Sequence, residues 1–146
     1  MRHHSHLLAL LPALMFASCG GEGSDSSSMP SSAELGQEYV IGFGETIHVD
    51  SLSLEFTTLA EESRCPTRVT CVWEGNARIL ITATRGSATS VLELNTSNRF
   101  PTSAVFEDHL ISLRSLHPYP ATPTTGPLPQ SYTATLFVDR QVVPAN

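Results

Sequence analysis

Apolar and polar residues alternate along much of this chain after residue 37, with a period of two rather than 3.6. In "LSLEFTTL", Leu52, Leu54 and Phe56 fall on one side, and the polar residues between them fall on the other. A β-strand places successive side chains on opposite faces. The segment therefore predicts a strand with one buried face.

The same alternation recurs in "NARILITAT", "HLISLRSL" and "SYTATLFVD", with the turn signals "GFGE", "VDS", "RGS" and "NTSN" between segments. No stretch shows the spacing of an amphipathic helix of about ten residues or more. We expect an all-β domain, an antiparallel sandwich or small barrel, and favour an immunoglobulin-like β-sandwich. The residues expected in its core are Leu54, Phe56, Trp73, Ile79, Ile81 and Leu136.

The chain begins with "MRHHSHLLALLPALMFASC", in which an apolar run follows a charged start and small residues precede Cys19. This layout is typical of a secretory signal and is too short for a spanning helix. The ending "FASC" resembles a bacterial lipobox, in which the cysteine receives lipid and becomes the mature N-terminus. We expect residues 1–18 to be a lipoprotein signal peptide; the alternative is an ordinary cleaved signal with an incidental Cys19.

Residues 19–35 are rich in Gly, Ser and acids and have almost nothing to bury. Such a segment cannot offset the entropy of ordering it, so we expect a flexible tether or a leader without a role. As a flexible coil it would reach about 20 to 25 Å. The remaining residues, 36–146, form the predicted β-sandwich domain.

Cys65 and Cys71 are left as a pair if Cys19 carries lipid, because the chain has three cysteines. An exported protein favours a structural disulfide between them. Their spacing is not that of a redox C-x-x-C pair, and no second pair of ligands matches a zinc site. Val69, Cys71 and Trp73 alternate with polar or outward positions, which predicts a strand with Trp73 buried beside the sulfur.

Eight arginines, no lysine and fourteen acids give a net charge of −6 at pH 7. The chain has no basic stripe of the kind that neutralises phosphates. Nucleic acid is therefore not expected as a partner.

No arrangement of residues predicts catalysis, a cofactor or a metal. A G-x-S-x-G elbow is missing, and "EDHLISL" places Asp108 and His109 next to each other, where strand residues would point to opposite faces. We expect a solvated turn there. His48 and Asp50 could share a strand face as half a metal site, although a lone strand histidine is more often a partly exposed residue.

The segment "HPYPATPTTGPLPQ" holds five prolines between Pro118 and Gln130. Proline lacks the N–H that a sheet ladder needs, so the segment is expected to run outside the sheets. It is either a stiff connection or a display of Tyr119 and Leu128 as part of a partner-binding surface.

The block "EESRCPTRVTCVWEGNARILI", with the alternating strands around it, resembles a family of small bacterial lipoproteins of unknown function. The family pattern is an acid-S-R-C-P segment, a second cysteine and a V-W-x-G-x-A run, and the resemblance spans residues 36–143. Arg68 stands where glycine is common in that family, and Glu74 where alanine is common. The resemblance implies export, lipid anchoring and a β domain, and it supplies no activity.

Two classes of function follow. The first is a non-enzymatic lipoprotein of the cell envelope that binds a protein, glycan or small molecule, or has a structural role. Its only expected membrane contact is the lipid on Cys19, and Gly20 favours the outer membrane if the source is Gram-negative, because an aspartate at that position commonly retains lipoproteins in the inner membrane. The second is a periplasmic protease inhibitor, or an enzyme whose residues lie on loops without a readable motif.

Overall fold

The computed structural model describes residues 33–123 and 131–141. The predicted signal segment, Cys19 and the tether as far as residue 32 lie outside the described residues, and so does Leu128.

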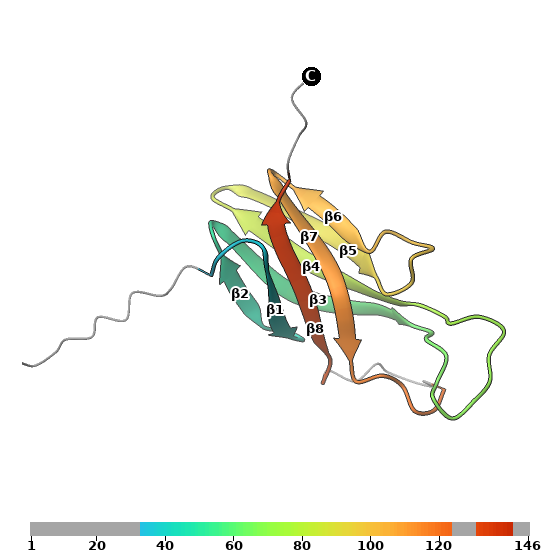
Figure 1. Ribbon diagram of the computed structural model, residues 1–146. Coiled ribbons are helices and arrows are strands. Elements are labelled where there is room, and N and C mark those ends of the chain that lie inside the picture. The colour runs from blue at the N-terminus through green and yellow to red at the C-terminus, as the bar shows by residue number, and fades with distance from the viewer. Residues whose placement is uncertain (1–32, 124–130, 142–146) are drawn as a thin grey trace, which may run out of the picture. The chain divides into compact units, whose positions relative to one another are not determined.

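The described residues form eight strands in two antiparallel sheets and contain no helix (Figure 1). Sheet I has the order β1-β8-β7-β6, and sheet II has the order β2-β3-β4-β5. The strands are β1 (Gln37–Gly42), β2 (Thr46–Val49), β3 (Leu52–Glu62), β4 (Ala77–Arg85), β5 (Ala88–Asn95), β6 (Ser103–Phe106), β7 (His109–His117) and β8 (Thr133–Arg140). The structure confirms the all-β class and the antiparallel sandwich, whereas its immunoglobulin-like character stays a prediction.

The core lies between the sheets and is built from the alternating residues of their inner faces. In β3 and β4 every second residue is buried over most of the strand, as the sequence pattern predicts. Five of the six residues expected in the core are fully buried: Leu54, Phe56, Ile79, Ile81 and Leu136. The edge of the Phe43 ring packs against the Phe56 ring, with centroids 5.4 Å apart, and extends the core towards the β1–β2 turn.

The two ends of the sandwich differ. At one end, which we call the turn end, three short turns connect β2 to β3, β4 to β5 and β6 to β7. At the other, which we call the loop end, the connections are longer: residues 63–76 follow β3, 96–102 follow β5, and 118–132 follow β7. Figure 1 shows the 63–76 and 96–102 loops towards the right, away from the short turns.

Trp73 is the exception among the predicted core residues, because its side chain is 40 % exposed. Residues 63–76 form no strand, and β4 begins only at Ala77. The alternation of Val69, Cys71 and Trp73 therefore belongs to a loop that projects beyond the sheets, where no facing sheet can cover the indole. The prediction of a buried Trp beside the sulfur was wrong for this reason.

Candidate functional site

The loop that carries Trp73 rests on a buried ion pair at the end of β3. The side chains of Arg64 and Glu62 are 5 % and 0 % exposed, and Arg64 Nε donates to Glu62 Oε1 over 2.9 Å. Burial raises the pKa of the Tyr132 hydroxyl, and the nearby Glu62 carboxylate raises it further. A buried pair of this kind depends on both partners, because either charge alone would be uncompensated.

Arg64 also joins the two sheets. Its Nη1 donates to the carbonyl of Leu116 over 2.7 Å, and its Nη2 donates to the carbonyl of Pro118 over 2.9 Å. Its guanidinium lies 4.7 Å from the centre of the Tyr119 ring. The base of the 63–76 loop, which follows β3 of sheet II, is thereby fixed to the end of β7 in sheet I.

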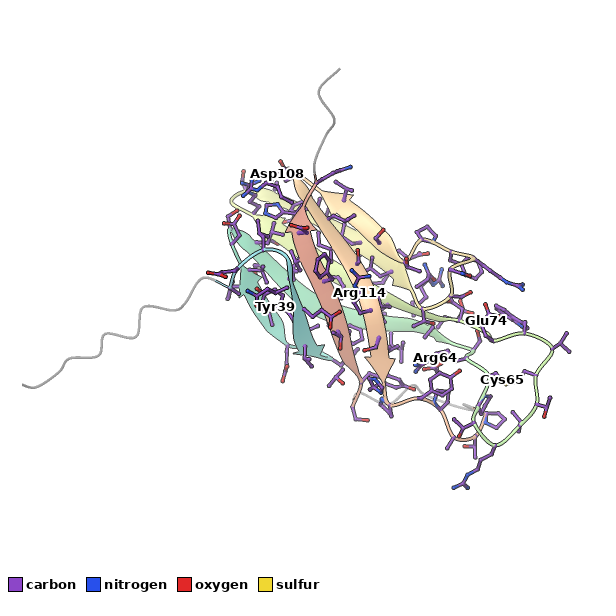
Figure 2. The ribbon with its side chains drawn as sticks, viewed as in Figure 1. Tyr39, Arg64, Cys65, Glu74, Asp108 and Arg114 are labelled. Atoms are coloured by element: carbon purple, nitrogen blue, oxygen red, sulfur yellow. A yellow bond between two sulfur atoms is a disulfide. The ribbon has the colours of Figure 1, made fainter. Side chains whose placement is uncertain are left out.

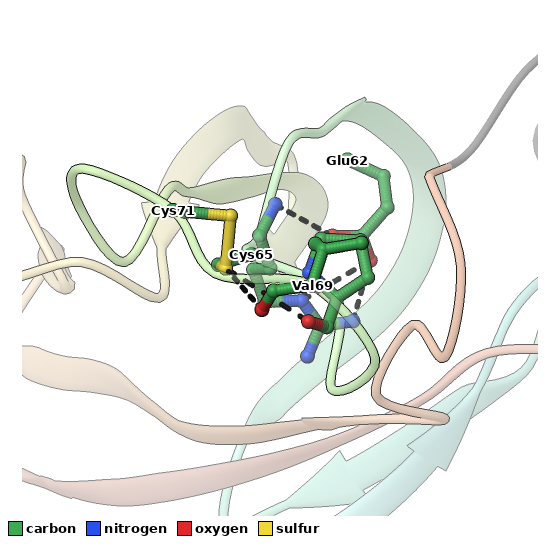
Figure 3. The surroundings of a disulfide bond; sticks show 6 residues. Glu62, Cys65, Val69 and Cys71 are labelled. Atoms are coloured by element: carbon green, nitrogen blue, oxygen red, sulfur yellow. Dashed lines mark hydrogen bonds and ion pairs between the residues drawn. A yellow bond between two sulfur atoms is a disulfide. The ribbon is translucent and has the colours of Figure 1, made fainter.

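Two further connections hold the base of this loop. Cys65 and Cys71 form a disulfide, as expected, with their Cα atoms 5.9 Å apart (Figure 3). Across the base, Cys65 N–H donates to Glu74 O over 2.8 Å. Gly75 has a φ of +74°, and a Cβ there would lie 1.9 Å from the Ser63 carbonyl oxygen. Only glycine allows this approach, so Gly75 has a local structural reason.

Buried amides connect the same loop to its neighbour. Asn76 Nδ2 donates to Asn95 Oδ1 over 2.9 Å, and Ser97 N–H donates to Asn76 Oδ1 over 3.1 Å. Ser97 Oγ in turn donates to Glu74 Oε1 over 2.9 Å. Backbone hydrogen bonding and this Ser97 contact hold the pKa of the Glu74 carboxyl below its usual value. The 63–76 and 96–102 loops therefore form one fixed unit.

Exposed apolar side chains lie on the three loops at this end of the sandwich, and we call them together the loop-end surface. Its members are Val69, Val72, Trp73, Phe100 and Tyr119. Val72 is fully exposed, and the other four are between 40 % and 46 % exposed. The Arg99 guanidinium lies 5.5 Å from the centre of the Trp73 ring and 3.8 Å from the Glu74 carboxylate. Two of these side chains, Val72 and Trp73, are neighbours on the disulfide-closed loop.

A pocket of about 210 Å³ lies near the base of this surface. It is lined by Arg64, Thr96, Leu113, Arg114, Ser115, Leu116, His117 and Tyr119. Figure 2 shows Arg114 on β7 and Arg64 at the loop end of the sandwich. No acidic side chain lines the pocket, and Arg114 is half-exposed.

A charged cluster occupies the opposite, turn end of the molecule. The His109 side chain is fully buried, with Nε2 3.2 Å from Asp50 Oδ2. Its Nδ1 lies 3.0 Å from Asp108 Oδ1, at an angle that does not make a hydrogen bond. Arg85 and Arg140 both pair with the Asp108 carboxylate.

The expected solvated turn at Asp108 and His109 is wrong for His109. Glu107, with a φ of +53°, completes the turn, and His109 is the first residue of β7, so it points into the sandwich. Asp108 belongs to the turn and not to the strand, so strand alternation does not separate it from His109. The imidazole is fully buried, and the cluster connects the β2–β3 and β6–β7 turns.

The structure separates the other predicted site residues. His48 is exposed on β2, and Asp50 contacts His109 instead. Tyr119 is part of the loop-end surface. In the described part of the chain, no three His, Cys, Asp or Glu side chains gather closely enough to hold a metal ion. Across residues 33–123 and 131–141, no helix is long and apolar enough to cross a membrane.

Sequence reasoning missed Arg64, Glu62 and Asn76. One signal was available: Glu62 and Arg64 stand two residues apart beside a strand, where side chains share a face. The contacts of Arg64 with the backbone of β7 left no local signal, because they join residues more than fifty positions apart. Comparisons with models of protein families, with curated proteins and with solved structures find no match.

Proposed function

We propose that this chain is an exported bacterial lipoprotein, anchored in the cell envelope through Cys19, whose β-sandwich is a non-enzymatic binding module. The observation that carries the proposal is the loop-end surface, in which Val72 and Trp73 stand exposed on a disulfide-closed loop. A tryptophan held in place before binding loses little conformational entropy on contact, and tryptophan is enriched among the residues that dominate binding energy.

The position of the N-terminal connection supports this proposal. Ala33 bridges Val49, and its carbonyl accepts from Asp50 N–H, so the chain enters the domain at the turn end. The loop end lies at the other end of β3, whose eleven residues span roughly 35 Å. A tether joined at the turn end leaves the loop end free to meet a partner.

Site-specific photo-crosslinking tests the proposal. A photoreactive residue at position 72, introduced in cells of the source organism, is expected to capture a discrete partner. The same residue at Val91, which is 59 % exposed on β5, is the matched control. Capture at position 72 should fall severalfold when Trp73→Ala is added. Equal capture at both positions, or capture that does not depend on Trp73, would contradict a binding role for this surface.

A further inference from the structure

The three long loops at the loop end are held to one another as well as to the sheets. Thr67 N–H donates to the carbonyl of Pro120 over 3.1 Å, which joins the 63–76 loop to the segment after β7. Ser97 Oγ donates to Glu74 Oε1 over 2.9 Å, which joins the same loop to the one after β5. The exposed apolar side chains of the three loops are therefore presented together at one end of the molecule.

Charge is distributed unevenly between these loops and the rest of the protein. The described residues contain seven arginines and twelve acids, of which Arg64 and Glu62 neutralise each other in the buried pair. Of the remaining charges, the loops carry two arginines and one acid: Arg68, Arg99 and Glu74. The rest of the described chain carries four arginines and ten acids. The three loops thus have a net positive charge in a protein that is acidic overall.

Each of the two arginines stands beside exposed apolar side chains. The Arg99 guanidinium lies 5.5 Å from the centre of the Trp73 ring, and Arg99 directly precedes the exposed Phe100. Arg68 is exposed and directly precedes the exposed Val69. Tryptophan prefers the boundary between hydrocarbon and water, and arginine can bury its apolar stem while its charge stays in the polar layer. This combination of side chains suits the interfacial layer of a membrane.

The shape of the surface also favours a fluid partner over a folded one. Val72 is fully exposed, and the apolar side chains are divided among three loops. A protein partner would need packing complementary to each of these projections. A bilayer accepts separate apolar side chains at the boundary between headgroups and acyl chains, and anionic headgroups attract nearby arginines.

The length of the sandwich separates this surface from the acids of the turn end. Asp50 and Asp108 lie in the β2–β3 and β6–β7 turns, roughly 35 Å from the loop end by the length of β3 (Figure 2). The Debye length at physiological ionic strength is about 8 Å, so charges at that distance are largely screened. The acidity of the whole chain therefore does not prevent the loop end from meeting an anionic surface.

We propose that the loop-end surface docks on an anionic phospholipid bilayer, as a second membrane contact besides the proposed lipid on Cys19. Val72 and Trp73 enter between the headgroups. Arg68 and Arg99 lie at the level of the lipid phosphates and pair with them. Binding of this kind combines buried apolar area with electrostatic attraction. This inference rests on the proposed function, since it names the partner of the loop-end surface.

The proposed anchor permits contact with the same membrane. Fully extended, residues 20–33 span at most about 50 Å. This exceeds the roughly 35 Å of β3, which separates the entry of the chain at Ala33 from the loop end.

The fluorescence of Trp73 tests the proposal, because it is the only tryptophan of the chain and belongs to the surface itself. The full chain with Cys19→Ser is titrated with vesicles of phosphatidylglycerol and phosphatidylcholine in equal parts, and with vesicles of phosphatidylcholine alone. With the anionic vesicles we expect the emission to move to shorter wavelength and brominated lipid to quench it. Affinity should be at least about tenfold lower for phosphatidylcholine alone, and high salt should weaken the anionic binding severalfold. An unchanged emission, even in a chain that sediments with vesicles through another segment, would overturn the proposal.

Matched variants assign the contact to the loop end. Arg68→Ala should weaken binding to the anionic vesicles about fivefold, as expected for one arginine near a charged bilayer. Arg140→Ala removes the same charge from the turn end, where the side chain is 53 % exposed, and should leave the affinity nearly unchanged. Val72→Ser should weaken binding at least about threefold, whereas Val91→Ser on β5 should not. Equal effects within either pair would overturn the assignment.

The outcome is separable from the proposed function. An emission that ignores vesicles, together with Trp73-dependent capture of a protein at position 72, would end only the lipid inference. Inorganic phosphate that shifts the emission without vesicles would reveal a local phosphate site and overturn the bilayer as the partner. Capture of a phospholipid at position 72 would support both proposals, and failure of both experiments would end the binding module as well.

Discussion

Arg64 supplies hydrogen bonds to three different segments from a side chain that is almost entirely buried. It contacts the Glu62 carboxylate, the Leu116 carbonyl and the Pro118 carbonyl, and it lies beside the Tyr119 ring. No other described arginine is buried to this extent. At the scale of single residues, the connection between the base of the 63–76 loop and the end of β7 therefore depends on one guanidinium group.

Arg64→Ala should lower the free energy of unfolding by about 3 to 5 kcal/mol, because it leaves the Glu62 carboxylate buried without a partner. Urea unfolding followed by circular dichroism measures the change. The double variant Glu62→Leu with Arg64→Met, which removes both charges and keeps apolar volume, should recover a large part of the loss. Arg78→Ala, which breaks the exposed pair with Glu93, should cost less than about 1 kcal/mol. A loss at Arg64 no larger than that at Arg78 would contradict the role given to the buried pair.

At the scale of elements, the strands were predictable where alternation and burial coincide. Leu54, Phe56 and Ile79 were assigned to the core from the period of two, and the facing sheet covers them. The same period misled at Trp73, because an extended loop alternates like a strand but has no opposite sheet. A sequence pattern shows which side chains share a side; it does not show whether anything packs against that side.

The candidate site was predictable only in its local parts. The disulfide followed from the count of cysteines, and the position of Tyr119 outside the sheets followed from the prolines around it. The contact of Arg64 with the end of β7 could not be predicted, because it joins residues that come together only after folding. The buried position of His109 likewise depends on Asp50, which is 59 residues distant in sequence.

The disulfide between Cys65 and Cys71 leads to a prediction about the 63–76 loop. Replacing both Cys65 and Cys71 with serine should lower stability by about 2.4 kcal/mol, because the bond closes a loop of seven residues in the unfolded chain. Thermal unfolding measures the loss, and far-ultraviolet circular dichroism should show that the strands persist. Trp73 is the only tryptophan, so its fluorescence reports directly on the loop. Iodide should quench it more readily in the variant. Two free thiols in protein isolated from the envelope would contradict the bond.

At the scale of the whole molecule, the sandwich has two distinct ends, with the N-terminal connection at one and the exposed apolar side chains at the other. The turn end also carries the charged cluster around Asp108, which Figure 2 shows far from Glu74 and Cys65. The proposed anchor at Cys19 joins the domain through Ala33 at the turn end, and the exposed apolar side chains lie at the loop end.

The lipid anchor has a direct test. Mass spectrometry of protein from the envelope should find a mature N-terminus at Cys19 carrying lipid, and the Cys19→Ser variant should be recovered without lipid in the soluble fraction. Cleavage at another residue, or an unmodified Cys19, would contradict the anchor and leave the fold of the described residues unaffected.

The closed base of the 63–76 loop also bears on how this protein can diversify. Gly75, the disulfide and the Cys65–Glu74 backbone bond fix the two ends of the loop, while the residues at its tip are exposed to solvent. Mutations at the tip are therefore expected to change the exposed side chains without disturbing the sheets below. In evolution and in protein engineering, residues 67–70 and 72–73 can therefore be substituted while the base of the loop keeps its contacts.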